Sequence, residues 1–218
     1  MSCCSGKGCD EFFNERVARR DARRYRRKGL DGNARRIVEL VRHRGVEGKT
    51  LLEVGGGIGA IQLELLKAGA VRAVNVELST AYDPYAAELL RVKGLEARAD
   101  RRVLDFAERA EELEPADVVV LHRVVCCYPD YETLVGAAAE HARDQLLLTF
   151  PRDVWWTRLG LGTINRLQRL RRRAFRVYLH APVAIMDVAS SRGLELATRE
   201  RGRLWELVSF ERPRRHAT

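Results

Sequence analysis

The sequence predicts an α/β protein with a mostly parallel sheet that helices cover on both faces. From Thr50 onward, short continuous apolar runs alternate with helical segments, which is the pattern of parallel strands buried on both sides. Two further runs near the end of the chain, separated by a charged turn that contains Gly202, predict an antiparallel hairpin. Together these observations favour one sheet that ends in an antiparallel strand.

The elements follow from the periodicity of the apolar residues. The expected strands are residues 51–54, 71–76, 95–99, 118–121, 145–150, 194–199 and 204–212. The expected helices between the parallel strands are residues 58–68, 84–92, 101–112 and 131–141. After Pro151 we expect a long Arg-rich helix, an apolar run at 175–179 and a helix at 182–191.

Two helices precede the sheet. The first, residues 10–28, is polar and Arg-rich and ends at Gly29, whereas Asp31 caps a second helix that ends at Gly45. We interpret residues 1–48 as a Cys- and Arg-rich helical cap and residues 49–218 as the domain that carries the chemistry.

Length and composition limit the class of protein. The chain has 218 residues, of which 46% are apolar and 32% charged, so it can bury a full core and disorder of the whole chain is excluded. No window approaches the roughly eighteen apolar residues of a membrane span, and the start of the chain has no apolar signal core. We therefore expect a cytoplasmic protein.

The net charge of +9 is unevenly distributed along the chain. Residues 16–28 carry eight basic side chains against one acid, and residues 158–176 carry seven arginines and no acid. The second segment has the composition of a basic amphipathic helix, which suits weak contact with an anionic membrane surface or with RNA phosphates. The alternative is a helix that covers the sheet and turns a solvated basic face outward.

The five cysteines form a poor disulfide framework. They are Cys3, Cys4, Cys9, Cys126 and Cys127. Their number is odd, and no C-x-x-C pairing occurs, so we interpret them as reduced thiols and assign no metal site. A thiol cluster that handles a metal or metalloid remains an alternative function, because the N-terminal segment and the loop after the fourth strand can meet in space.

The segment most informative about function is residues 51–60, in which a buried strand leads through glycines into a helix. Glycines at Gly55, Gly57 and Gly59 let the backbone approach a ligand closely. The second strand ends at Glu77, where a carboxylate can accept both hydroxyls of a ribose. These features describe a nucleoside-binding site.

Two cofactors compete for this site. Gly55, Gly57 and Ala60 satisfy the dinucleotide fingerprint of an NAD-dependent oxidoreductase. Glu53, however, lies inside an otherwise apolar strand, where a carboxylate is costly without a partner. A cationic ligand such as S-adenosyl-L-methionine supplies that partner, whereas a pyrophosphate does not. The sequence therefore favours S-adenosylmethionine.

At this point the sequence resembles the class I S-adenosylmethionine-dependent methyltransferases. The family motif E-x-G-x-G-x-G matches Glu53, Gly55, Gly57 and Gly59. Glu77 matches the acidic end of the second strand, and Asp105 with Phe106 matches the pair that contacts the adenine. The resemblance implies a Rossmann-like, seven-stranded sheet with an antiparallel last strand. It also implies methyl transfer from S-adenosylmethionine.

Two other segments narrow the resemblance. Residues 122–130 and 150–156, with the Cys- and Arg-rich N-terminus, look like a bacterial small-molecule subgroup often grouped with magnesium-protoporphyrin O-methyltransferases. This likeness implies a small-molecule acceptor and favours O-methylation. A stable nucleic-acid complex is not expected, although an RNA-directed methyltransferase or RNA-binding protein stays an alternative. The oligomeric state is left open.

Candidate residues for the acceptor side follow the fourth and fifth strands. His122 and Tyr128 are candidate general bases because they lie just beyond the carboxyl end of the fourth strand. The other candidates, which would form an aromatic pocket or bind carboxylates, are Arg123, Tyr131, Arg152, Trp155 and Trp156. Each of these side chains has an alternative role in ordinary packing or backbone hydrogen bonding.

Overall fold

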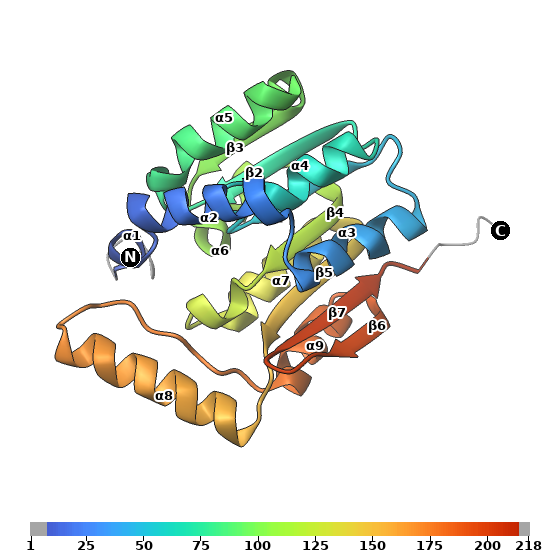
Figure 1. The fold of residues 1–218 in the computed structure, drawn as a ribbon. Helices are drawn as coiled ribbons and strands as arrows, with labels where there is room; N and C mark the ends of the chain where they lie inside the picture. The colour runs from blue at the N-terminus through green and yellow to red at the C-terminus, as the bar shows by residue number, and fades with distance from the viewer. Residues whose placement is uncertain (1–7, 214–218) are drawn as a thin grey trace.

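The computed structural model, which describes residues 8–213, contains one seven-stranded sheet (Figure 1). The strands are β1 (Thr50–Val54), β2 (Arg72–Glu77), β3 (Ala99–Val103), β4 (Ala116–His122), β5 (Ala142–Pro151), β6 (Glu195–Arg201) and β7 (Trp205–Glu211). Their order is β3-β2-β1-β4-β5-β7-β6. All pairs are parallel except β5–β7 and β6–β7, so β7 alone runs against the others. The predicted Rossmann-like methyltransferase architecture is confirmed.

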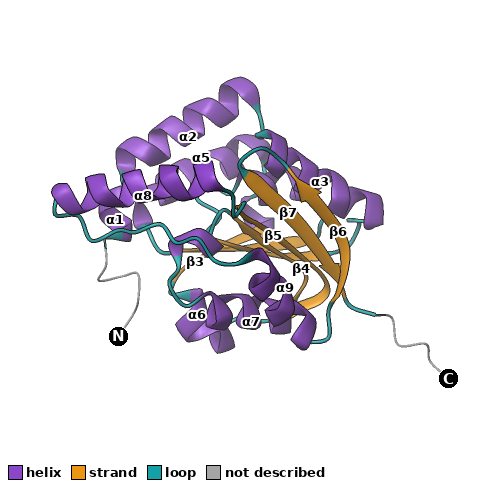
Figure 2. Ribbon diagram, turned by 90° about the horizontal axis from the view of Figure 1, so that it is seen from below, coloured by secondary structure: helices purple, strands orange, loops and turns teal. Residues whose placement is uncertain are grey.

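Helices cover both faces of this sheet (Figure 2). One layer comprises α2 (Glu15–Lys28), α3 (Gly32–Arg44), α4 (Ala60–Lys67) and α5 (Asp83–Lys93). The other comprises α6 (Phe106–Arg109), α7 (Tyr131–His141) and α9 (Pro182–Ser191). Successive residues of a strand point to opposite faces, and accordingly Leu51 and Leu52 of β1 belong to different cores. Each face of the sheet therefore has its own core.

The third strand differs from the prediction. Residues 96–98, inside the run expected to be a strand, form a short 3-10 helix, and β3 begins at Ala99. As an edge strand, β3 is mostly polar and partly exposed, so the apolar run that marks a central strand is absent from it. The helix expected from residue 101 consequently starts only at Phe106.

Two helices also differ from the prediction. The expected helix 10–28 is broken into α1 (Cys9–Phe12) and α2, because the Asn14 side chain accepts hydrogen bonds from the backbone N–H groups of Arg16 and Val17 and so starts a new helix. The Arg-rich helix is α8 (Trp155–Leu170), which ends before most of its expected arginines. Among residues 8–213, none of the helices has the length and apolarity needed to span a membrane.

Candidate functional site

A cavity of about 740 Å³ opens at the carboxyl ends of the parallel strands. Its walls come from the loop between β1 and α4, the ends of β2 and β4, the turn after β3, and one side of α2. The order of the strands reverses between β1 and β4, and in open α/β sheets ligands bind at such a switch point. The cavity therefore lies where this fold binds its ligands.

The loop between β1 and α4 has a backbone that only glycine adopts readily. Gly55, Gly57 and Gly59 have φ values of +63°, +55° and +69°. A Cβ atom at Gly55 would lie 2.5 Å from Val124 Cγ2, and one at Gly59 would lie 2.4 Å from Gln62 Nε2. Side chains are thus excluded both by conformation and by space, so this loop presents bare backbone.

Glu53 is buried beneath this loop. One carboxylate oxygen accepts the backbone N–H of Gln62 at 3.1 Å, in the first turn of α4. Burial raises the pKa of Glu53 from its usual 4.5 to about 8, a rise that the Gln62 hydrogen bond and the charge of Arg101 only partly offset. Above that pH, the buried carboxylate is a negative charge that favours a cationic ligand.

Further polar atoms around Glu53 are buried without a hydrogen-bond partner among the described residues. They are the side-chain amide atoms of Asn75, Gln62 Oε1 and Arg101 Nη2. Buried polar groups are nearly always hydrogen-bonded in folded proteins, so a cluster of orphaned ones marks a place where a polar ligand or water completes the network. Glu53 lines the cavity, whereas Gln62, Asn75 and Arg101 lie behind it and are not part of its lining.

The end of β2 places a second carboxylate at the rim of the glycine loop. Glu77 Oε2 accepts the backbone N–H of Gly57 at 2.9 Å, and its Oε1 accepts that of Leu78 at 2.8 Å. These contacts fix the carboxylate at the edge of the cavity, at the position expected for a group that accepts ribose hydroxyls.

The turn after β3 forms the next part of the wall. Asp105 caps α6 by accepting the backbone N–H of Ala107, and it also accepts the hydroxyl of Tyr128 at 3.1 and 3.2 Å. Phe106 is buried beside it, and both residues line the cavity. Tyr128 therefore contacts the residues expected to hold an adenine.

A separate cluster surrounds His122 at the end of β4. Nδ1 of His122 lies 2.9 Å from the hydroxyl of Thr149, and Nε2 lies 3.6 Å from Asp31 Oδ2. Arg123, in the left-handed conformation with φ of +62°, pairs with the same carboxylate oxygen at 3.1 Å and stacks on Trp205. His122, Arg123 and Asp31 all line the cavity.

Burial and neighbouring charge set the protonation states in this cluster. Burial holds the pKa of His122 below its usual range, an effect that the charge of Arg123 reinforces and Asp31 only partly opposes. Burial alone would raise the pKa of Asp31, but its hydrogen bonds, the charge of Arg123 and, at the low pH where Asp31 titrates, the charge of protonated His122 keep it well below its usual range. At neutral pH the cluster therefore pairs a neutral imidazole with a carboxylate.

The remaining predicted acceptor residues do not line the cavity. The ring of Tyr131 packs against His180, and Arg152 donates to the carbonyl oxygen of Gly202 at 2.9 Å. Trp155 and Trp156 contact each other at the start of α8, where both are exposed. The structure thus groups Arg123 with the residues predicted to bind a cofactor and places these four side chains elsewhere.

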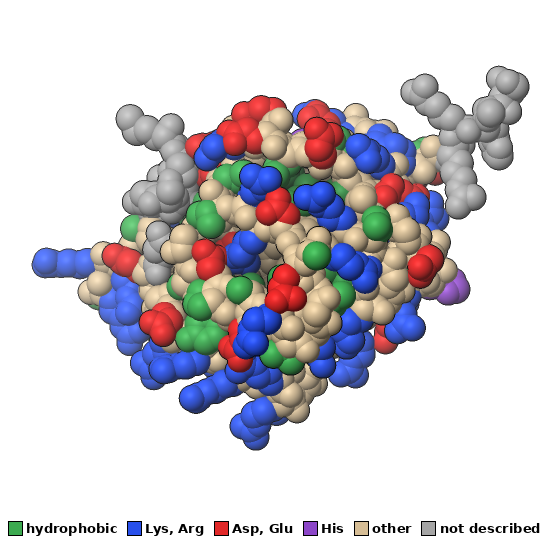
Figure 3. Space-filling view, turned by 90° about the horizontal axis from the view of Figure 1, so that it is seen from above, with side chains coloured by type: hydrophobic (Ala, Val, Ile, Leu, Met, Phe, Trp, Pro, Cys, Tyr) green, Lys and Arg blue, Asp and Glu red, His purple; other side chains and the backbone are tan. Residues whose placement is uncertain are grey.

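Other residues that line the cavity were not singled out from the sequence. Arg16, Arg20 and Arg24 lie four residues apart on one side of α2, and Arg171 and Arg173 follow the end of α8. The four-residue spacing along α2 is a signal in the sequence that places its arginines on one side of the helix. No local sequence pattern indicates that the residues after α8 lie close to them. Basic side chains also gather along one edge of the surface, at the bottom of the view in Figure 3.

The cysteines contribute to one wall of the cavity. Cys9 and Cys127 line it, and the sulfur atoms of Cys126 and Cys127 lie 3.9 Å apart. Cys3 and Cys4, which the proposed thiol cluster would include, lie outside the described residues. In the part of the chain from 8 to 213, no three His, Cys, Asp or Glu side chains are grouped so that they could hold a metal ion.

The sequence matches no family model and no curated protein. Solved structures do resemble the chain. Magnesium protoporphyrin IX methyltransferase from Synechocystis PCC 6803 with bound S-adenosylhomocysteine is 19% identical, with a TM-score of 0.72 over 93% of this chain and 97% of that one. An O-methyltransferase family protein from Burkholderia thailandensis is 18% identical, with a TM-score of 0.65 over 84% and 57%. A putative RNA methyltransferase from Pyrococcus horikoshii is 15% identical, with a TM-score of 0.56 over 84% and 82%. The fold is therefore that of S-adenosylmethionine-dependent methyltransferases.

Proposed function

We propose that this chain is an S-adenosylmethionine-dependent methyltransferase that acts on a small molecule, most readily on an oxygen nucleophile. The observation that carries the proposal is Glu53, a buried carboxyl group beneath a glycine loop that presents bare backbone. A cationic ligand stabilises the ionised form of Glu53, whereas the pyrophosphate of a dinucleotide would repel it. The nearby solved structures of methyltransferases, one with bound S-adenosylhomocysteine, support the same cofactor.

Each part of the cofactor has a candidate partner. Backbone at Gly55 and Gly57, which line the cavity, would lie against the methionine moiety, with Gly59 completing the turn and Glu53 supporting the amino group. Glu77 would accept the ribose hydroxyls, and Asp105 with Phe106 would bind the adenine. The hydroxyl of Tyr128 holds the Asp105 carboxylate in place, so we assign Tyr128 a positioning role on the adenine side. Residues 1–48 would act as a cap, since α2 forms one wall of the cavity.

When bound, S-adenosylmethionine supplies a methyl group activated by the sulfonium. His122, at the end of β4, is the candidate base for an acceptor that arrives as a hydroxyl, because its imidazole is neutral at neutral pH. Transfer of that methyl group to the acceptor oxygen would leave S-adenosylhomocysteine as the second product. The hydroxyl proton moves to His122, and the Asp31 carboxylate then stabilises the imidazolium.

Positive charge around the opening favours an anionic acceptor, such as one with carboxylate groups. Arg16, Arg24, Arg171 and Arg173 line the cavity, and none of them forms an ion pair with the side chains described at residue 9 and from 11 to 213. Arginine binds carboxylates through paired hydrogen bonds. Substituting Arg24→Gln should raise the KM for such an acceptor without changing cofactor affinity, whereas Arg19→Gln, on the same helix but outside the cavity lining, should change neither.

Calorimetric titration with S-adenosylhomocysteine and with NADH tests the cofactor. We expect micromolar binding of S-adenosylhomocysteine and none of NADH. Glu77→Gln should weaken the binding by about tenfold, or about 1.4 kcal/mol. The matched control is Glu88→Gln on α5, a half-buried position outside the cavity lining, which should bind as the unmodified protein does. Binding of NADH alone would refute the proposal in favour of an oxidoreductase.

A further inference from the structure

The side of α8 that faces solvent is its most apolar side. Trp155, Leu159 and Leu170 are 71%, 66% and 73% exposed. Trp156, Ile164 and Leu167 are exposed as well. At 3.6 residues per turn, Trp155, Leu159 and Leu170 share one face of the helix, with Trp156 and Leu167 beside it. We call these five residues the α8 stripe; Ile164 lies on another side of the helix.

The side of α8 that faces the protein is mostly polar, with the half-buried Leu161 as its apolar residue. The buried residues of this helix are Thr157 and Gln168. The side chain of Asn165 holds the returning chain by donating to the carbonyl oxygen of Val177 at 2.7 Å and accepting its N–H at 2.9 Å. A helix that covers a core in water has the opposite arrangement, with its apolar side inward. The α8 stripe therefore lacks an apolar partner in the described part of the chain.

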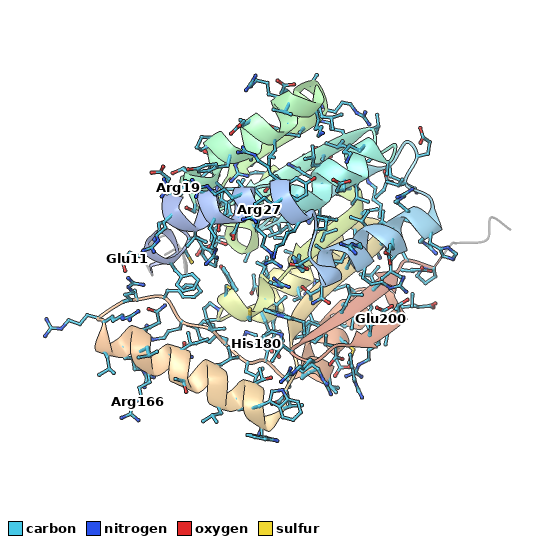
Figure 4. All side chains as sticks on the ribbon, viewed as in Figure 1. Glu11, Arg19, Arg27, Arg166, His180 and Glu200 are labelled. Atoms are coloured by element: carbon cyan, nitrogen blue, oxygen red, sulfur yellow. The ribbon has the colours of Figure 1, made fainter. Side chains whose placement is uncertain are left out.

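The stripe is flanked by positive charge. Arg158 and Arg169 lie beside the stripe on α8, Arg166 falls within it at helical spacing, and Arg171 to Arg173 follow the end of the helix. Among these, Arg158 has an acidic partner, Asp153, and the others form no ion pair with the acidic side chains described from residue 11 to 213. Figure 1 shows α8 at the periphery of the fold, and in Figure 4 Arg166 extends from it away from the rest of the chain. This helix is accessible to a large flat partner.

We propose that α8 docks the protein on the surface of an anionic lipid bilayer, with the α8 stripe at the level of the headgroups and acyl chains. Tryptophan and leucine beside arginine are the side chains that interfacial helices use, because the rings and aliphatic groups leave water while the guanidinium groups contact lipid phosphates. A second copy of this chain would bring the same unpaired arginines against one another, and the net charge of +9 adds to that repulsion. The positive charge of the arginines around the stripe therefore favours an anionic surface over a second copy of this chain as the partner.

Docking through α8 would place the cavity next to the membrane. The chain leaves α8 through Arg171 and Arg173, which line the cavity, and continues to Phe175. The ring of Phe175 stacks on Phe12 at 4.3 Å between centroids, and Phe12 also lines the cavity. A membrane-borne amphiphilic acceptor would then reach the cavity without crossing bulk water. This consequence rests on the proposed function, whereas the docking itself does not.

Vesicle co-sedimentation of the full chain tests the proposal. The probes are vesicles of phosphatidylglycerol mixed with phosphatidylcholine, and vesicles of phosphatidylcholine alone. The stripe variant carries Trp155→Ser, Leu159→Ser and Leu170→Ser, three exposed positions whose replacement leaves both cores intact. The matched control carries Val71→Ser, Val92→Ser and Val183→Ser, which are also exposed apolar positions but lie elsewhere. Circular dichroism establishes that all three proteins are folded.

We expect binding to the anionic vesicles that exceeds binding to phosphatidylcholine by at least about tenfold and weakens as salt is added. The stripe variant should bind the anionic vesicles at least about tenfold more weakly than the unmodified protein, whereas the control variant should bind them as strongly as the unmodified protein does. Equal binding by the stripe variant, or no binding by the unmodified protein, would overturn the proposal. A dimer in sedimentation velocity that the stripe variant abolishes would overturn it in favour of a self-interface. S-adenosylhomocysteine titration of the stripe variant reports on the cofactor site independently.

Discussion

Replacement of Glu53 by glutamine tests the electrostatics at the base of the cavity. Burial raises the pKa of Glu53 from 4.5 to about 8, so between these values the folded protein keeps a proton that the unfolded chain has released. The free energy of unfolding must therefore fall as pH rises through this window, and the loss is complete above the folded-state pKa. Glu53→Gln keeps an oxygen that can accept the Gln62 N–H, but the amide cannot ionise. The variant should therefore not lose stability through this window.

The size of the effect follows from the same pKa values. At about 1.4 kcal/mol for each pH unit, the ceiling is about 5 kcal/mol between pH 4.5 and 8. We expect the free energy of unfolding, measured with urea, to change in favour of Glu53→Gln relative to the unmodified protein by about 2 kcal/mol or more as pH rises from about 5 to about 9. A difference that stays constant with pH would show that Glu53 ionises normally and would refute the reasoning.

If a cationic cofactor ionises Glu53, its binding near pH 7 should also release a proton, measurable by calorimetry in buffers of different ionisation enthalpy.

Three other changes give further expectations. Tyr128→Phe removes the hydroxyl that Asp105 accepts, and S-adenosylhomocysteine should then bind roughly fivefold more weakly in calorimetry, with little change in thermal stability. Gly59→Ala adds a Cβ to a residue with positive φ and places it too close to Gln62. Urea unfolding should therefore show a free energy of unfolding lower by about 2 kcal/mol, and an unchanged midpoint would contradict the fit described for the loop. If His122 is the base, kcat/KM for a hydroxyl acceptor should fall as pH drops below 6.5, since protonation removes the base and burial holds its pKa below that value; a profile that His122→Asn leaves unshifted would exclude this role.

The parts of the molecule that were predictable from the sequence are local. The strand, turn and helix around Gly55 lie within residues 50–67, so the pattern of glycines and apolar residues specifies both the turn and the buried position of Glu53. The position of β3 differs from the prediction because this edge strand is polar and partly exposed, so it has no apolar run that marks it. Leu95, where the expected strand begins, lies before the 3-10 helix and outside β3.

The acceptor side depends on contacts between distant segments. Whether Trp155 faces the cavity or solvent is decided by where α8 packs, and that is set by polar contacts such as those of Asn165 with Val177 rather than by apolar periodicity. Asp31 was recognisable as a helix cap, but its approach to His122 joins residues ninety-one positions apart and has no signature in the sequence.

A crystal structure with S-adenosylhomocysteine tests the central claim most directly, because it shows where the nucleoside lies. The account predicts ribose hydroxyls on Glu77, adenine beside Asp105 and Phe106, and the homocysteine moiety against the glycine loop above Glu53. A nucleoside bound elsewhere, or a cavity that stays empty at saturating concentrations, would contradict the assignment of this cavity as the cofactor site.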